Sequence, residues 1–250
     1  SSGLHKEGMI FLGIGLVIYH VYFGLEQKKF GLKRVLGIMI GLLLFLLLRN
    51  FILVLMVPAI TAMLIAYRWP GRTLASFGIT YLFFCILFFT LRYIDPRLDF
   101  PEAVVQKQQA FLKLSGNSSV RITELEPTLG SFVANTPQAI RLSTLRPYPS
   151  DVHHLLSMAA AAETGLLLLL FLLTLLFRRR DMELRKPIVY FCIFFSCSLL
   201  LTIGFSVNNL GAIVRYRSVI LPLLVVVMLA YTDWPRVGAL IKKYIRKNNN

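Results

Sequence analysis

The chain has 250 residues, of which 56% are hydrophobic and 16% are charged, and its formal net charge is +15. Its mean hydropathy of +0.68 exceeds what one soluble core of this length can bury, which excludes an ordinary soluble domain and indicates an integral membrane protein. The positive charge does not indicate nucleic-acid binding, because the basic residues form short clusters between apolar runs, as at the cytoplasmic ends of membrane helices.

Seven apolar segments approach the length of a membrane span, since a hydrocarbon core of roughly 30 Å needs about 20 helical residues. They run from Met9 to Leu25, Val35 to Leu48, Phe51 to Tyr67, Leu74 to Ile94, Leu155 to Phe177, Ile188 to Ser206, and Ser218 to Tyr231. We therefore expect an all-α polytopic transmembrane bundle. Four spans lie in residues 1–94, a partly helical outer connection in 95–154, and three spans with a basic tail in 155–250.

The second and third segments are divided only by Arg49-Asn50, and together they are too long for one span. This pattern predicts a tight helical hairpin, with a single bent or re-entrant element as the alternative. Gly37 and Gly41 form a small-xxx-small pair, which predicts close contact with another helix.

Lysine and arginine in the short loops predict the orientation, because cytoplasmic loops carry an excess of these residues. The cytoplasmic set is Lys28, Lys29, Lys33, Arg34, Arg68, Arg72, Arg178, Arg179, Arg180, Arg185, Lys186, Arg236, Lys242, Lys243, Arg246 and Lys247. The N-terminus is then outside and the C-terminus in the cytoplasm. A start at Ser1-Ser2-Gly3 without methionine indicates an excerpt of a longer polytopic protein, with further helices before residue 1.

Two helices are expected within the outer connection. Asp99, Pro101 and Glu102 form a helix start, from which a surface helix continues to about Leu114. A second short helix is expected to begin near Pro137, with Asn135 or Thr136 as its cap.

Basic residues mark the outer ends of the predicted spans: Lys6, Arg49, Arg92, Arg215 and Arg217, with Glu7 as the one acidic residue placed among them. Snorkelling toward lipid headgroups accounts for Lys6 and Arg92. Arg217 is expected just before a helix whose N-terminal dipole is already positive, which is unfavourable unless an anion lies between them. Arg215 and Arg217 therefore predict a phosphate or carboxylate site; structural pairing with a carboxylate and headgroup contact are the alternatives.

Glu163 is a candidate structural partner for those arginines. It lies a third of the way into the fifth segment, and Ala159 and Ala160 share its helix face. Small residues let another helix approach, so Glu163 is expected to face the bundle and to pair with Arg49 or Arg217. Catalytic or proton-relay use is the alternative.

His153 and His154 lie just outside the fifth segment. We interpret them as wetted interfacial residues, with acid–base catalysis and metal binding as alternatives. All three cysteines lie within apolar runs, and no metal spacing, P-loop, dinucleotide fingerprint or nucleophile elbow occurs. The sequence therefore predicts no metal and no cofactor.

The segment Gly211-Ala212-Ile213-Val214-Arg215-Tyr216-Arg217, followed by Pro222, resembles an Arg-aromatic-Arg and proline pattern in bacterial multispanning proteins of surface-polysaccharide assembly. These include exopolysaccharide and O-antigen polymerase-like proteins and GT-C membrane glycosyltransferases. The start Ser2-Gly3-Leu4-His5-Lys6-Glu7, together with Asn135-Thr136-Pro137 and Arg146-Pro147-Tyr148-Pro149, is similar to segments of such proteins.

The resemblance implies a polyprenyl-pyrophosphate-linked saccharide bound at the outer face of a bacterial inner membrane, with glycosyl transfer to another saccharide. Arg215 and Arg217 would hold the pyrophosphate, helped by Arg49 or Arg146, with Tyr216 and Lys6 in the substrate site. Glu163, His153 and His154 complete the candidate catalytic residues. Arg49, Arg215 and Arg217 are then expected to border one outward-facing cavity. A transporter or flippase of an anionic lipid or solute, and a non-catalytic membrane subunit, are the alternatives.

Overall fold

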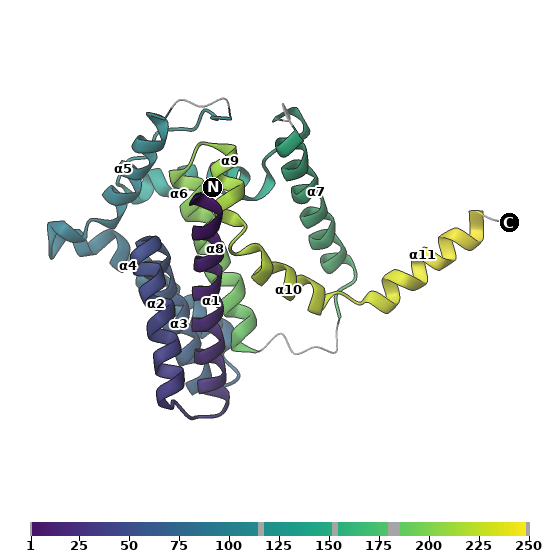
Figure 1. The fold of residues 1–250 in the computed structure, drawn as a ribbon, viewed down its shortest axis with the longest axis horizontal. Helices are drawn as coiled ribbons and strands as arrows, with labels where there is room; N and C mark the ends of the chain where they lie inside the picture. Colours follow the sequence, from purple (N-terminus) through teal and green to yellow (C-terminus); the bar gives the residue numbers. More distant parts are fainter. Residues whose placement is uncertain (1, 115–117, 152–154, 180–185, 249–250) are drawn as a thin grey trace.

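The structure, a computed structural model, describes residues 2–114, 118–151, 155–179 and 186–248. Over these residues the chain is all-α, which confirms the predicted fold class (Figure 1). The helices are α1 (Ser2–Glu26), α2 (Leu32–Leu48), α3 (Asn50–Arg68), α4 (Thr73–Thr90), α5 (Phe100–Leu112), α6 (Leu129–Ile140), α7 (Leu155–Leu176), α8 (Pro187–Ser206), α9 (Leu210–Arg217), α10 (Leu221–Tyr231) and α11 (Trp234–Asn248). Short 3-10 turns follow α4 and precede α7, and a π-helical turn extends α6.

Five of the described helices, α1, α3, α4, α7 and α8, are long and apolar enough to cross a membrane. A sixth span arises if α9 and α10 count as one element, although the two meet at a bend of 59°. The predicted second span is α2, whose 17 residues are at the short limit for crossing a bilayer. The predicted count of seven is therefore approximate, and the seventh segment is an 11-residue helix entered through a bend.

The hairpin expected around Arg49 is present as two separate helices, α2 and α3, with Arg49 alone between them. Its extended backbone (φ −157°) ends one helix and starts the next. α2 also packs along α1, and the approach is close because glycines line the contact. A Cβ added at Gly41 would lie 2.6 Å from Val17 and 2.8 Å from the Gly13 carbonyl oxygen. The small-xxx-small prediction is thereby confirmed.

Helix α8 is the centre of the molecule, since α3, α4, α5, α6 and α10 all contact it. Its buried face includes Phe195, Leu199 and Ile203. Gly204 lies on the same helix, where a Cβ would stand 2.1 Å from the carbonyl oxygen of Ala139 in α6. Backbone of the outer connection therefore rests directly on a membrane helix at this point.

Replacing Gly204 with alanine is expected to destabilise the protein by at least about 1–3 kcal/mol, because backbone atoms must move to accept the methyl group. Gly165→Ala in α7 is the matched control, since a Cβ there meets nothing within 4 Å and alanine favours a helix by up to about 1 kcal/mol. Thermal unfolding in detergent should give Gly204→Ala a lower melting temperature than Gly165→Ala. Equal melting temperatures for the two variants would refute the contact between Gly204 and Ala139.

The outer connection is anchored by α5, which begins as predicted: the Asp99 carboxylate accepts a hydrogen bond from the Glu102 amide at 3.0 Å. Gln108 of this helix is buried. Its amide donates to the carbonyls of Thr123 and Phe205, and its oxygen accepts from the Leu125 amide. One side chain thus joins α5, the following loop and the end of α8.

The prediction for the second connection helix was wrong. α6 begins at Leu129, capped by the Thr128 side chain, and contains Pro137 in its interior. Asn135 lies within the helix, where its amide donates to the Ser131 carbonyl. The chain then forms a π-helical turn, Arg141–Leu145, before the Pro147 and Pro149 region. The helix starts instead after Thr128, which also has capping character and lies nine residues before Pro137.

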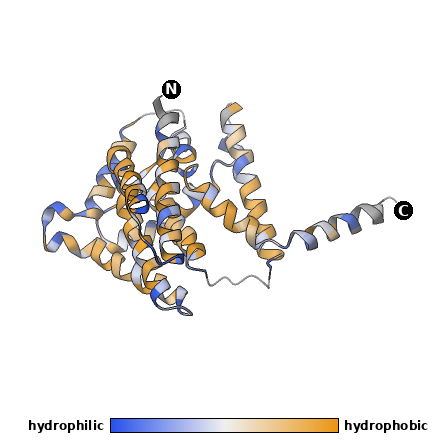
Figure 2. Ribbon diagram, turned by 60° about the horizontal axis from the view of Figure 1, so that its bottom comes forward, coloured by the Kyte–Doolittle hydropathy of each residue, from blue (hydrophilic) through white to orange (hydrophobic). Residues whose placement is uncertain are grey.

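Figure 1 draws the N-terminus, α5, α6 and α9 at one end of the bundle, and the α1–α2 and α3–α4 turns at the other. The outer connection and the basic turns therefore lie at opposite ends, as the charge pattern requires; which end faces the cytoplasm stays a prediction. α7 stands apart from the bundle with its leucines exposed, and α11 extends away as an arm (Figures 1 and 2).

Candidate functional site

Helix α9 divides the Arg-Tyr-Arg motif between two environments. Leu210, Ile213 and Arg217 recur every three or four residues and are buried, whereas Arg215 is on the exposed side. Residues two apart on a helix do not share a face. Both arginines occupy the last turn of α9, where a positive charge is favourable to the helix dipole. The predicted dipole conflict was therefore wrong, because an additional helix begins before the motif.

Arg217 is enclosed, with 1% of its surface exposed. Its Nη1 donates to the Arg146 carbonyl oxygen at 2.7 Å and its Nη2 to Thr164 Oγ1 at 2.6 Å. The same Nη2 lies 3.5 Å from Glu163 Oε1. We call Arg217, Glu163, Thr164 and the Arg146 carbonyl the Arg217 network. It ties α9 to α7 and to the end of the outer connection, so Arg217 is a structural residue and not an exposed phosphate clamp.

The predicted pairing of Glu163 with an arginine is present in this network. Of the two arginines weighed, the partner is Arg217 and not Arg49. Arg146 contributes its carbonyl, while its own guanidinium lies 3.8 Å from Asp151 and over the Tyr148 ring.

A second group forms around Arg49, in the turn between α2 and α3. Arg49 Nη2 lies 2.5 Å from Glu7 Oε1 of α1, and Arg215 Nε lies 3.5 Å from the same oxygen. The Arg49 guanidinium stacks over the Tyr216 ring at 3.8 Å, with Arg215 at 5.2 Å from that ring. Arg49 and Arg215 therefore converge on Glu7, whereas Arg217 does not join them. The prediction that all three arginines border one outward-facing cavity was wrong, because Arg215 alone of the three lines the cavity at this position.

Lys107 of α5 adds a third cation to this group. Its Nζ lies 4.1 Å above the Phe51 ring, and the Arg49 guanidinium lies 6.0 Å from the same ring. We call Glu7, Arg49, Lys107, Arg215 and Tyr216 the Arg49 cluster. Three cations and one carboxylate give it two net positive charges. A cavity of about 300 Å³ between α5 and α9 reaches Arg215, whose side chain is 47% exposed.

Only part of this arrangement was predictable from the sequence. Glu7 was expected on the same rim but not in the site, and Lys107 lies in the expected surface helix without a predicted site role. No local pattern identifies Lys107, because its position over Phe51 depends on how α5 packs on α8 and α4.

Burial, and after it the neighbouring Arg49, lower the pKa of the Lys107 ammonium below its ordinary value of 10.5. An anion bound here needs the protonated lysine, so raising the pH through this lowered pKa removes a charge and weakens binding. We expect the affinity for sulfate, whose charge is constant, to fall as the pH rises, and the fall to begin at a lower pH than for an ordinary lysine with a pKa of 10.5. Titration calorimetry should show the fall abolished in Lys107→Arg; an unchanged fall would assign it to another group.

The remaining predicted residues lie elsewhere. Lys6 is exposed near the start of α1. Arg92 does more than snorkel, since it donates to the Pro127 carbonyl at 2.9 Å and lies over Tyr93. His153 and His154 fall outside the described residues. Among the residues that are described, no three His, Cys, Asp or Glu side chains are arranged to hold a metal ion.

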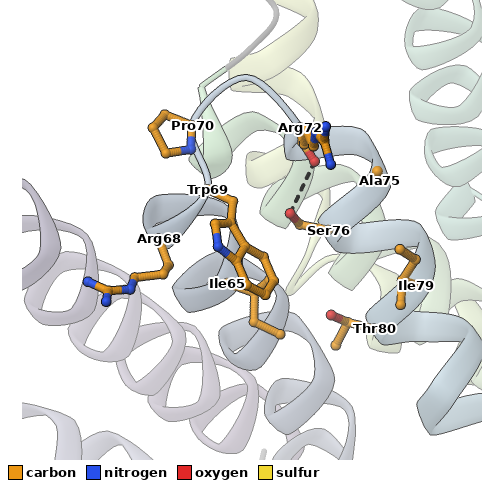
Figure 3. Close-up of a pocket in the computed structure, with 9 residues that line it drawn as sticks. All are labelled: Ile65, Arg68, Trp69, Pro70, Arg72, Ala75, Ser76, Ile79 and Thr80. Carbon is orange, nitrogen blue, oxygen red and sulfur yellow. Dashed lines mark hydrogen bonds between the residues drawn. The ribbon is translucent and has the colours of Figure 1, made fainter.

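A cavity of about 520 Å³ at the opposite end of the bundle contains none of the predicted site residues. Figure 3 shows Trp69 and Ile65 on one side and Ile79 and Thr80 on the other, with Arg68 pointing away from them. The one hydrogen bond drawn joins Ser76 to the Arg72 carbonyl at 3.0 Å. Arg68 and Arg72 also line this cavity, but neither belongs to the predicted outer site.

Searches with protein-family models, among curated proteins and among solved structures found no match to this chain. The geometry of the Arg49 cluster and the sequence resemblance are therefore the two observations that bear on function.

Proposed function

We propose that this integral membrane protein acts in cell-surface polysaccharide assembly and binds the phosphate groups of a polyprenyl-pyrophosphate-linked saccharide at the Arg49 cluster. The observation that carries the proposal is the convergence of Arg49 and Arg215 on the single carboxylate of Glu7, with Lys107 beside Arg49 over the Phe51 ring. The sequence resemblance supplies the saccharide class.

The charge balance favours an anionic ligand. Cations at the edge of a hydrocarbon region are costly unless paired or solvated, and one carboxylate cannot satisfy two guanidiniums and an ammonium. A pyrophosphate carries several acceptor oxygens that match guanidinium geometry. Tyr216 holds the Arg49 plane in place, so less side-chain entropy is lost on binding.

Glycosyl transfer from such a donor breaks the bond between the anomeric carbon and a phosphate oxygen, and the departing pyrophosphate keeps the electron pair. The acceptor hydroxyl forms the new bond to carbon, and its proton passes to the departing pyrophosphate or to water. Fixed cations at the departing oxygen stabilise the charge that develops there, commonly by a few kcal/mol per donor. Glu7 is already engaged by two arginines, so we assign the main contribution to leaving-group stabilisation.

Reconstitution tests the proposal. Purified protein in liposomes is supplied with a polyprenyl-pyrophosphate-linked oligosaccharide, and product length is followed by electrophoresis. Arg215→Ala should abolish elongation, whereas Arg34→Ala at the opposite end should not. Failure of the wild-type protein to lengthen or transfer the glycan, with surface polymer unchanged in cells carrying Arg215→Ala, would refute the enzymatic role.

Movement of an anionic lipid across the membrane is a second candidate function. The observation that favours it is the 59° break between α9 and α10, since discontinuous membrane helices commonly line transport sites. The same liposomes discriminate: a fluorescent lipid phosphate that changes leaflet without glycan transfer supports transport. Glycan transfer without leaflet exchange supports the enzyme.

A further inference from the structure

An apolar cavity of about 570 Å³ lies between the membrane helices α3, α4 and α8 and the outer helices α5 and α6. Its walls include Val54, Phe84, Phe88, Val104, Phe132 and Leu201. Of its lining hydroxyl groups, those of Thr136, Ser198 and Thr202 each donate to a carbonyl four residues earlier in their own helix, and that of Tyr81 has no hydrogen-bond partner among the described residues. The cavity therefore presents hydrocarbon and offers little to bind water.

The cavity begins about one helical turn from the Arg49 cluster on two different helices. On α3, Val54 lines the cavity three residues after Phe51; on α5, Val104 lines it three residues before Lys107. Lys107 Nζ and the Phe51 ring are themselves 4.1 Å apart. Since one turn advances about 5.4 Å, a cation stands within reach of a group attached to a chain in the cavity.

We propose that this cavity holds the hydrocarbon chain of the same phosphate-bearing lipid whose anionic group binds the Arg49 cluster. The inference rests on the proposed anion site and adds the part of the ligand that the cluster does not contact. The volume lies in the range of roughly 300–1,000 Å³ that accommodates one drug-sized molecule, so it suits a length of chain. A peptide segment would bring backbone polar groups to walls that cannot pair with them.

Surrounding lipid is as apolar as the cavity, so the chain gains little from leaving water when it enters. Its contribution comes from close packing and from attachment to a headgroup that is already bound. A chain without the phosphate should therefore bind poorly, and the phosphate without the chain should bind at the cluster alone.

Two cysteines provide a built-in test in the full chain. Cys85 and Cys197 are both exposed, and only Cys85 lines the cavity. A lipophilic maleimide is applied in nanodiscs, and each alkylation rate is measured by mass spectrometry. Dodecyl phosphate at about ten times its Kd should lower the alkylation rate of Cys85 about tenfold, because the ligand then occupies the cavity most of the time. The alkylation rate of Cys197 should stay unchanged. Inorganic pyrophosphate should slow neither.

Equal slowing of both cysteines, or no slowing of Cys85 by dodecyl phosphate, overturns the inference. If pyrophosphate still binds the wild-type protein in that case, the proposed anion site survives and only the chain site fails. If pyrophosphate does not bind, the proposed function fails; protection of Cys85 without pyrophosphate binding rules out a shared ligand.

Filling the cavity gives an independent check. Thr202→Phe should weaken dodecyl phosphate binding at least about tenfold, equivalent to about 1.4 kcal/mol, with pyrophosphate affinity unchanged. Thr90→Phe is the matched control, because Thr90 also donates to the carbonyl four residues earlier but is exposed and lies outside the cavity lining. Equal effects of the two substitutions would contradict a chain site.

Discussion

Replacing Arg49 with alanine is expected to lower the affinity for a pyrophosphate-bearing lipid by about 10- to 100-fold. A hydrogen bond to a charged group is worth roughly 1.5–3 kcal/mol, and Arg49 is far more enclosed than Arg215, with 14% of its side chain exposed against 47%. Its removal also takes the guanidinium off the Tyr216 ring. The measurement is titration of the purified protein with inorganic pyrophosphate and with the lipid.

Glu7→Gln is expected to change the pyrophosphate affinity in the opposite direction from Arg49→Ala, so the two variants together test the anion site specifically. The Glu7 carboxylate occupies Arg49 and Arg215 when no ligand is present, so it competes with an incoming anion. Neutralising it should tighten pyrophosphate binding, whereas Arg49→Lys should weaken it less than Arg49→Ala, because the charge remains and the planar fork is lost. Weaker binding by Glu7→Gln would show that the carboxylate holds the cluster together and does not compete.

Local sequence signals predicted the elements well where one principle dominated. Apolar length located the membrane helices, and the Asp99, Pro101 and Glu102 start of α5 is present as expected. The start of α6 was missed because two capping signals competed, and the earlier one at Thr128 prevails. Pro137 is tolerated inside that helix, where α6 rests on α8.

The site was predicted in part, because helix phase could not be assigned without the boundary of α9. Once α9 is known to begin at Leu210, its period places Arg215 and Arg217 on different faces. The pairing of Glu163 was predictable because few acidic residues accompany many cations. The contribution of Lys107 was not, since it depends on the packing of α5 on α8 and α4, which no spacing within one helix encodes.

Arg217→Ala is expected to destabilise the protein by about 2–4 kcal/mol without removing a ligand contact. Breaking a buried ion pair by deleting one partner typically costs about 3–5 kcal/mol, and the lower range applies because 43% of the Glu163 side chain is exposed. Arg217 also satisfies the Arg146 carbonyl and the Thr164 hydroxyl. Thermal unfolding in detergent should show the loss.

Arg215→Ala is the matched comparison, two residues away on the same helix and 47% exposed. It should leave the melting temperature nearly unchanged and weaken pyrophosphate binding, while Arg217→Ala lowers the melting temperature and leaves the folded fraction able to bind. Adding Glu163→Gln to Arg217→Ala should recover part of the stability, because the unpaired carboxylate is then neutral. A variant Arg217→Ala that melts like the wild type but no longer binds pyrophosphate would reverse the assignment and return Arg217 to the ligand.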